Sequence, residues 1–389
     1  MPDPLHLVDA TMFWSPTGGG VRRYLQTKHA WLAAQAGWRH SLAVPRVAGA
    51  SATAASLPSW PLPGSGGYRL PVHRRAIARV LVGMRPDLIE AGDPYRVAWG
   101  ALDAARTLGI PVLACCHSNV VAMARLAAGP RLAPAAGRIA ERYARRVYRG
   151  FDLVLAPSRS MAAHLQEWGV ARVACQPLGV DTTVFHPQAR DRSWRERQGW
   201  SEATRLLVYA GRFAAEKHLD VLAAAVERLG APYLLLAVGA GPAPPPASER
   251  VVVLPFVASA RDLATVLASA DAFVHAGDQE TFGLSALEAM ACATPAVLRA
   301  SEGLAELADG GSGAIAVQTG RAEAFAEAVA ALFSGDRDGH SRAARKRAEA
   351  SDWLQVFPSL LGHYRHLVGT AADESADSER DAAATALQR

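Results

Sequence analysis

Cysteine and long apolar runs are both scarce in this sequence. Its 389 residues include four cysteines, and none of them has the spacing of a metal site. No stretch approaches the ~18 consecutive apolar residues of a membrane-spanning helix. The chain starts MPDPLHLVDA, which lacks the basic and apolar regions of a signal peptide. These absences exclude a disulfide scaffold and a membrane span, and we expect a cytoplasmic protein with reduced thiols.

The sequence also lacks a strong charge bias, but its arginines are unevenly placed. The formal net charge is +5, whereas residues 125–149 carry seven arginines and one acid, Glu141. A second basic helix, with Arg75 and Arg79, is predicted after Leu70. Such helices are typical of a solvated surface or of contact with an anionic membrane, here its inner face, and no motif predicts a nucleic-acid partner. In a helix over 135–149, five arginines share one face beside three apolar residues (Arg138, Arg142, Arg145, Arg146 and Arg149; Ile139, Tyr143 and Val147).

Predicted strands and helices alternate in two series, separated by a polar seam at residues 179–205. This alternation indicates an α/β protein with parallel sheets covered on both faces. It predicts two Rossmann-like domains, with ligands at the carboxyl ends of the strands and an active site in the cleft between the domains. We expect strands at 5–10, 88–93, 111–117, 152–158, 171–179, 206–211, 233–239, 251–256 and 272–276, and helices at 21–36, 96–108, 135–149, 159–168, 218–229, 261–269, 284–292 and 352–368.

The segment 276–298, AGDQETFGLSALEAMACATPAVL, is the most informative part of the chain. A predicted strand enters it and a predicted helix leaves it, so the amides of Phe282, Gly283 and Leu284 lie at a helix N-terminus, where they can hold an anion. Glu280 and Glu288 would be ~12 Å apart in a continuous helix, which is too far for a shared acid–base dyad. The spacing suits two separate hydroxyl-rich parts of one elongated ligand.

Two further segments place polar groups at strand ends. Gly18, Gly19 and Gly20 open the first helix, where a glycine turn and the helix dipole favour a phosphate, although a flexible turn would have the same sequence. His117 ends the strand 111–117, a position that a hydrogen-bonded structural histidine also occupies.

The pattern E-x-F-G-L-x-x-L-E-A-M resembles the donor-binding motif of retaining family 4 glycosyltransferases of the GT-B fold. Residues 211–217, GRFAAEK, resemble the G-R-x-x-x-E-K segment of that family, and residues 177–185 resemble its P-x-G-V-D linker. The resemblance covers about 5–368. It implies an N-terminal acceptor domain at 1–180, a nucleotide-sugar donor domain at 181–350, and a helix at 351–369 that crosses back to the first domain. The composition of 370–389 predicts a disordered tail.

The resemblance also assigns roles to individual residues. It implies that Arg212 and Lys217 neutralise the leaving diphosphate, and that His117 and Glu280 act at the transferred sugar. Donor-binding roles fall to Gly18, Gly19, Gly20, Phe282, Gly283, Leu284 and Glu288, and to Phe256 and Val257 near the nucleobase. No cofactor and no metal ion are implied. The one D-x-D sequence, Asp336-Arg337-Asp338, is predicted to be a surface turn.

The expected activity is transfer of a hexose, with retention of configuration, from a nucleotide diphosphate sugar such as GDP-mannose or a UDP-hexose. The acceptor would be a hydroxyl, lipid-linked or on a glycan intermediate. The leaving phosphate would take the acceptor proton, because no carboxylate is placed as a nucleophile. Two alternatives remain: an epimerase of nucleotide sugars with the same architecture, and a non-catalytic module that binds nucleotide sugars or membranes. One departure from the family pattern is Ser301-Glu302-Gly303 in place of a Gly-Gly pair.

Overall fold

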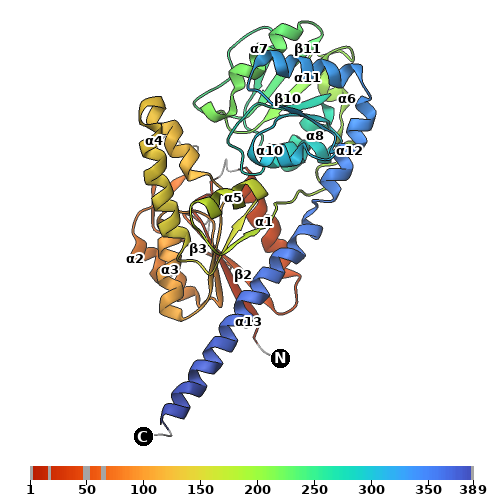
Figure 1. Cartoon of the computed structure of the whole chain (residues 1–389). Coiled ribbons are helices and arrows are strands. Elements are labelled where there is room, and N and C mark those ends of the chain that lie inside the picture. Colours follow the sequence, from red (N-terminus) through yellow and green to blue (C-terminus); the bar gives the residue numbers. More distant parts are fainter. Residues whose placement is uncertain (1–2, 16–18, 47–52, 63–66, 387–389) are drawn as a thin grey trace. The chain divides into compact units, whose positions relative to one another are not determined.

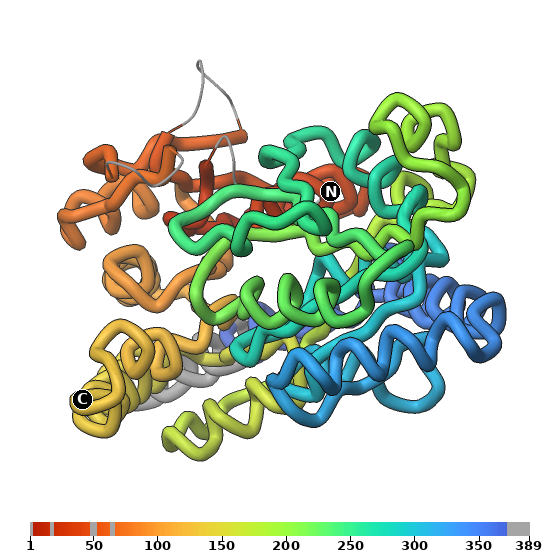
Figure 2. The backbone as a smooth tube through the Cα atoms, turned by 90° about the horizontal axis from the view of Figure 1, so that it is seen from above, coloured from red at the N-terminus to blue at the C-terminus, as the bar shows by residue number. Residues whose placement is uncertain are grey.

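The computed structural model describes residues 3–15, 19–46, 53–62 and 67–386. The chain forms two compact units. The N-terminal unit comprises Met1–Ala156, Ala162–Gln176 and Phe357–Arg389, and the C-terminal unit comprises Pro157–Met161 and Pro177–Val356. Strands and helices alternate along the chain, whose course can be followed from red to blue along the tube in Figure 2.

The N-terminal unit is built on a seven-stranded parallel sheet with the order β3-β2-β1-β6-β7-β8-β9. Helices α2, α3 and α4 lie on one side of this sheet and α1 and α13 on the other (Figure 1). The strands are β1 (Leu5–Ala10), β2 (Trp38–Val44), β3 (Ala54–Ser56), β6 (Leu88–Ala91), β7 (Val112–Cys115), β8 (Leu153–Ala156) and β9 (Val173–Cys175). The helices are α1 (Gly20–Ala33), α2 (Arg74–Met84), α3 (Arg96–Leu108), α4 (Val120–Tyr148) and α5 (Arg159–Glu167), and β4 (Ser59–Pro61) and β5 (Arg69–Pro71) form a separate antiparallel pair.

The C-terminal unit contains a six-stranded parallel sheet with the order β12-β11-β10-β13-β14-β15. Alternate residues of β10 enter two different apolar clusters, Leu206 and Val208 in one and Leu207 and Tyr209 in the other, so both faces are buried. The strands are β10 (Arg205–Ala210), β11 (Tyr233–Val238), β12 (Val251–Leu254), β13 (Ala272–His275), β14 (Ala296–Arg299) and β15 (Ala314–Val317). The helices are α6 (Arg192–Arg197), α7 (Leu219–Leu229), α8 (Ala260–Ser269), α9 (Leu284–Ala291), α10 (Glu302–Leu307), α11 (Ala322–Ser334) and α12 (Arg337–Glu349).

Helix α13 (Trp353–Ala386) returns the chain to the N-terminal unit from Phe357 onward. The ring centroid of Phe357 lies 5.2 Å from that of Trp31 on α1, and Tyr364 lies 6.0 Å from Trp38 on β2. The two parallel sheets and the returning helix confirm the predicted α/β class. The helix continues to Ala386, through most of the segment for which composition predicts disorder, in an alanine-rich sequence with high helix propensity.

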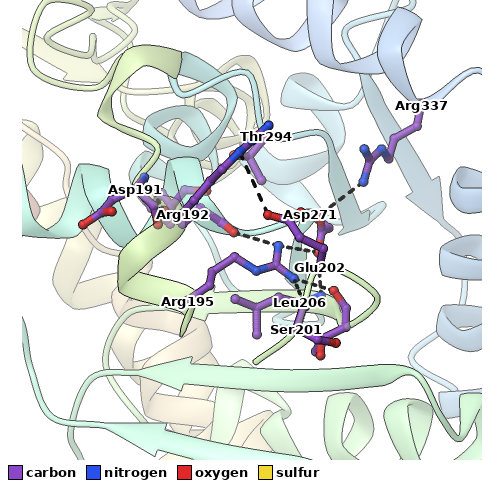
Figure 3. A network of polar contacts seen from close by, with 12 residues as sticks. Asp191, Arg192, Arg195, Ser201, Glu202, Leu206, Asp271, Thr294 and Arg337 are labelled. Carbon is purple, nitrogen blue, oxygen red and sulfur yellow. Dashed lines mark hydrogen bonds and ion pairs between the residues drawn. The ribbon is translucent and has the colours of Figure 1, made fainter. Parts of the chain in front are cut away.

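A buried arginine fastens the polar seam to the C-terminal sheet (Figure 3). Arg195 of α6 is 2% exposed, and its Nη1 lies 3.1 Å from Asp271 Oδ2. Asp271 precedes β13, accepts from the Leu206 amide at 2.8 Å, and contacts Arg337 at 3.2 Å. This network ties the starts of β10 and β13 to α6 and α12, at the edge of the sheet opposite the strand carboxyl ends.

Two predictions of local structure are wrong. Asp336 is not in a surface turn: it caps the N-terminus of α12, accepting from the Gly339 amide at 2.8 Å, and Arg337 and Asp338 form the first helical turn. The basic helix does not begin at 135, because α4 starts at Val120 and is kinked at Gly129 before Pro130. Of the predicted apolar row, Val147 is buried in the core, whereas Ile139 and Tyr143 are exposed.

Candidate active site

Lys217, Glu280 and His275 meet at the carboxyl edge of the C-terminal sheet. Lys217 ends the 3-10 turn η2 (Ala215–Lys217) after β10, and its side chain is 11% exposed. Its Nζ forms an ion pair with Glu280 Oε1, and His275 Nε2 lies 3.2 Å from the same oxygen. Glu280 occupies the loop between β13 and α9. The structure therefore brings together Lys217 and Glu280, as predicted, and adds His275.

The electrostatics of this cluster fix its charge states. Burial disfavours the charged form of Glu280, but the Lys217 ammonium and the His275 hydrogen bond outweigh burial and hold the pKa of Glu280 well below its usual range. Burial lowers the pKa of His275 despite the neighbouring carboxylate. At neutral pH the cluster thus contains an ionised carboxylate beside a neutral imidazole, and Glu280 is an acceptor rather than a proton donor.

Helix α9 begins beside this cluster. Gly283 is its N-cap, with φ 92° and ψ 49°, a left-handed conformation that favours glycine. A Cβ there would also lie 2.6 Å from the Leu304 side chain. Gly283 is therefore needed for both conformation and space. Its position directs the first amides of α9, including that of Leu284, out of the helix end, where an anion is stabilised.

The remaining donor-side residues have mixed environments. Glu288 is buried five residues after the N-cap, and Phe282 is also buried. Phe256 and Val257 are half-buried between β12 and α8. The Arg212 side chain is 67% exposed, and its Nη2 lies 2.9 Å from Glu216 Oε1. Its carbonyl oxygen accepts from the Tyr209 hydroxyl at 2.9 Å, so the backbone is anchored while the guanidinium stays at the surface.

The predicted site residues of the N-terminal unit lie around α1 and the end of β7. Gly18 is outside the described residues. Gly19 is the N-cap of α1 and Gly20 its first residue, and a Cβ on Gly19 would meet nothing within 4 Å, so packing does not require glycine there. His117 is half-buried, and its ring lies 5.7 Å from that of Tyr24. Burial, and then the nearby Lys28, lower the pKa of His117 to about 4.

A buried charge cluster near His117 was missed by the sequence prediction. Lys28 of α1 lies 2.7 Å from Asp9 and 2.9 Å from Glu90, and all three side chains are at most 3% exposed. Its Nζ also donates to the Tyr364 hydroxyl of α13 at 3.1 Å. The sequence contains one sign of this cluster: two apolar strands, LHLVDA and LIEAGD, each have an acidic residue near the end. The partners on α1 and α13 depend on tertiary packing.

Neither metal binding nor membrane spanning is indicated within the described ranges. Among these residues no group of three or more His, Cys, Asp and Glu side chains is arranged to hold a metal ion. No helix in the same part of the chain is long and apolar enough to cross a membrane. Cys115, Cys116 and Cys292 are buried as free thiols, and Cys175 is exposed.

Comparison with known proteins agrees with this arrangement. Residues 18–184 match the family described as Glycosyltransferase Family 4, and residues 204–335 match Glycosyl transferases group 1. The chain is 32% identical over 377 residues to a GDP-mannose-dependent alpha-(1-6)-phosphatidylinositol dimannoside mannosyltransferase of Mycobacterium tuberculosis, covering 92% of this chain and 95% of that protein. It is 31% identical over 322 residues to a GDP-mannose-dependent alpha-mannosyltransferase of Mycolicibacterium smegmatis, covering 80% and 82%.

Solved structures show the same fold at lower sequence identity. Sucrose-phosphate synthase from Thermosynechococcus elongatus superposes with a TM-score of 0.77 at 20% identity, covering 94% of this chain and 100% of that one. Anabaena HepE in complex with UDP and glucose gives a TM-score of 0.69 at 16% identity, covering 96% and 99%. Together with the sequence matches, these likenesses confirm the predicted resemblance: the chain belongs to glycosyltransferase family 4 and is a hexosyltransferase of the GT-B fold.

Proposed function

We propose that this enzyme transfers mannose from GDP-mannose, with retention of configuration, to a hydroxyl of a phosphatidylinositol mannoside or a similar glycolipid. The observation that carries the proposal is the Lys217–Glu280 ion pair beside the N-terminus of α9, which offers a cation, a sugar-hydroxyl acceptor and an anion site together. The names of the relatives at 31% and 32% identity support the donor and the lipid acceptor.

Catalysis would rest on stabilising the departing diphosphate. Lys217 is nearly buried and held in one geometry by Glu280, so its charge needs no reorganisation as the leaving group develops negative charge. The exposed Arg212 would exchange Glu216 for phosphate oxygens, and the first amides of α9 would bind the same group. Fixed cations and a helix dipole would thus neutralise the diphosphate, as a divalent metal ion does in metal-dependent enzymes, so no metal is required.

The other residues would orient the two substrates. Glu280, ionised and anchored, accepts hydrogen bonds from hexose hydroxyls, and Glu288 from the ribose. Neutral His117 contacts the hexose. Gly18, Gly19 and Gly20 would lie near the diphosphate, and Phe256 and Val257 near the base. The leaving phosphate oxygen accepts the proton of the attacking hydroxyl on the same face, which preserves the anomeric configuration.

We also propose that α4 holds the enzyme at an anionic membrane, where a lipid acceptor resides. Leu132 is 63% exposed and Ile139 66% exposed, and Met123 and Leu126 of the same helix are exposed as well. Arg138, Arg142 and Arg145, with Glu141, line a hollow on the same helix. Apolar side chains beside arginines suit insertion among anionic head groups.

Thermal unfolding with a panel of nucleotide sugars tests the donor assignment. A ligand present at 100 times its Kd stabilises the folded state by about 2.7 kcal/mol, so GDP-mannose at saturating concentration should raise the Tm by several degrees. UDP-glucose and ADP-glucose are the matched comparisons. A larger shift with either of them would contradict GDP-mannose as the donor.

A further inference from the structure

Lys28 is the centre of a closed charge cluster at the carboxyl edge of the N-terminal sheet. Asp9 and Glu90 are register partners on the adjacent strands β1 and β6, so both carboxylates point to the same face of the sheet. The Lys28 ammonium bridges them and is itself fully buried. A buried cation that binds two carboxylates is held in a single place, because moving it would leave uncompensated charge in the protein interior.

Tyr24 connects this cluster to His117. It lies one helical turn before Lys28 on α1, and the Lys28 Nζ is 5.0 Å from the centroid of its ring. The Tyr24 hydroxyl is 3.4 Å from Glu90 Oε1. On its other side the Tyr24 ring meets His117 edge-on, with an interplanar angle of 65°. The ring is therefore fixed at one end by the charge cluster and contacts the imidazole at the other.

We propose that Tyr24 and Lys28 are positioning residues for His117: the cluster around Lys28 fixes the Tyr24 ring, and that ring sets the orientation of the imidazole. The proposal rests on the role at the donor hexose proposed above for His117. Neither residue needs to touch substrate.

The same arrangement keeps His117 uncharged. Burial disfavours the imidazolium, Lys28 adds repulsion, and Asp9 opposes both more weakly. Another neighbour, Cys115, has its Sγ 3.8 Å from His117 Nδ1, and burial raises the pKa of this thiol, so it stays neutral. A neutral imidazole has one nitrogen that accepts a hydrogen bond from a sugar hydroxyl, whereas an imidazolium can only donate.

The cluster includes a contact that serves as an internal control. Tyr364 of α13 binds Lys28 and donates to Glu90, but its ring is not the one that contacts His117. Tyr364→Phe removes a buried hydroxyl while leaving Lys28, both carboxylates and Tyr24 in place. This variant therefore shows whether losing any hydrogen bond in the cluster affects His117, or only losing the contacts made through Lys28 and Tyr24.

The test is an NMR titration of His117 in the full-length protein, without donor or acceptor, with His117→Asn used to assign the signal. Lys28→Met leaves two buried acids without their cation, so the charge-matched Lys28→Met/Glu90→Gln keeps the experiment interpretable if the single variant does not fold. We expect both to raise the midpoint from about 4, because repulsion by Lys28 is gone while Asp9 remains. Tyr364→Phe should leave the midpoint where it is.

Tyr24→Leu tests orientation, since it removes the ring contact but no charge. We expect kcat to fall about tenfold or more while GDP affinity, measured by calorimetry, stays within about twofold, the pattern of an interaction made with the reacting sugar only. An unchanged His117 midpoint in the folded Lys28 variants, or an equal loss of GDP binding and kcat in Tyr24→Leu, would overturn the proposal. Full activity of His117→Asn would instead refute the role of His117 at the hexose, whatever the titration shows.

Discussion

The catalytic role proposed for Lys217 depends on the constraint on its side chain. The side chain is nearly buried and its position is fixed by Glu280, which His275 holds from the other side. A flexible surface lysine would lose rotamer entropy each time it met a phosphate. Arg212, with 67% of its side chain exposed, resembles such a flexible surface cation more than it resembles Lys217. The two cations should therefore contribute unequally to the rate.

Lys217→Ala should lower kcat by about 10²–10³-fold and weaken GDP binding much less, because one preorganised donor to the developing charge is lost. Steady-state kinetics with calorimetry of GDP binding measures both quantities. Lys346→Ala, which removes an exposed lysine of α12, is the control. A near wild-type kcat with only a raised KM would remove Lys217 from the catalytic groups.

Glu280→Gln and Glu288→Gln should separate two parts of the donor site. Glu280 lies in the loop beside Lys217, so its amide variant should mainly slow transfer, whereas Glu288, buried in α9, should mainly affect nucleotide binding. Calorimetry with GDP alone distinguishes them. An equal loss of GDP affinity in the two variants would show that the assignment of the two glutamates is incorrect.

At the scale of elements, α6 and α4 illustrate opposite uses of arginine. Arg195 on α6 is buried against Asp271 and fastens the seam that precedes β10. The arginines of α4 face solvent beside exposed Leu132 and Ile139. Sequence pattern predicted the basic character of α4 and the strand–helix alternation. It did not predict the N-cap role of Asp336 or the burial of Val147, because both depend on which surface each helix packs against the core.

Arg195→Met should destabilise the protein by about 3 kcal/mol, since it leaves a buried carboxylate, Asp271, without its inner partner. Arg337→Met, which removes the more exposed partner of the same carboxylate, is the matched control and should cost about 1 kcal/mol or less. Urea unfolding followed by fluorescence measures the difference. Equal destabilisation by the two substitutions would mean that burial of the ion pair does not determine its contribution.

Arg138→Glu/Arg142→Glu/Arg145→Glu should abolish co-sedimentation with anionic liposomes. Each basic side chain near such a surface contributes about 1 kcal/mol, and the attraction is screened by salt beyond roughly 8–10 Å. A control with the same change of charge, Arg321→Glu/Arg342→Glu/Lys346→Glu, alters the exposed residue before α11 and two exposed positions of α12. Binding that survives the α4 substitutions and high salt, or that is equally lost in the control, would contradict a membrane role for α4.

For the whole molecule, the family and the fold could be predicted from local sequence, whereas the supporting charge cluster could not. Short motifs such as E-x-F-G report backbone geometry within a few residues. Lys28, Glu90 and Tyr364 are brought together from α1, β6 and α13, and the lysine and the tyrosine are 336 positions apart in the sequence. Contacts at that separation leave no periodic signal in one sequence. His275 was missed for a different reason: its partner Glu280 is only five positions away, but a histidine at a strand end is usually structural.

The most direct test of the account is the product formed from GDP-mannose and a phosphatidylinositol mannoside acceptor in the presence of EDTA. We predict transfer of one mannose in α-linkage, the configuration of the donor, at a rate unaffected by EDTA, because in the proposed mechanism Lys217, Arg212 and the N-terminus of α9 neutralise the diphosphate. Proton NMR of the anomeric signal in the isolated glycolipid identifies the linkage. A β-linked product, or activity that disappears with EDTA and returns with Mg²⁺ or Mn²⁺, would contradict the proposed mechanism.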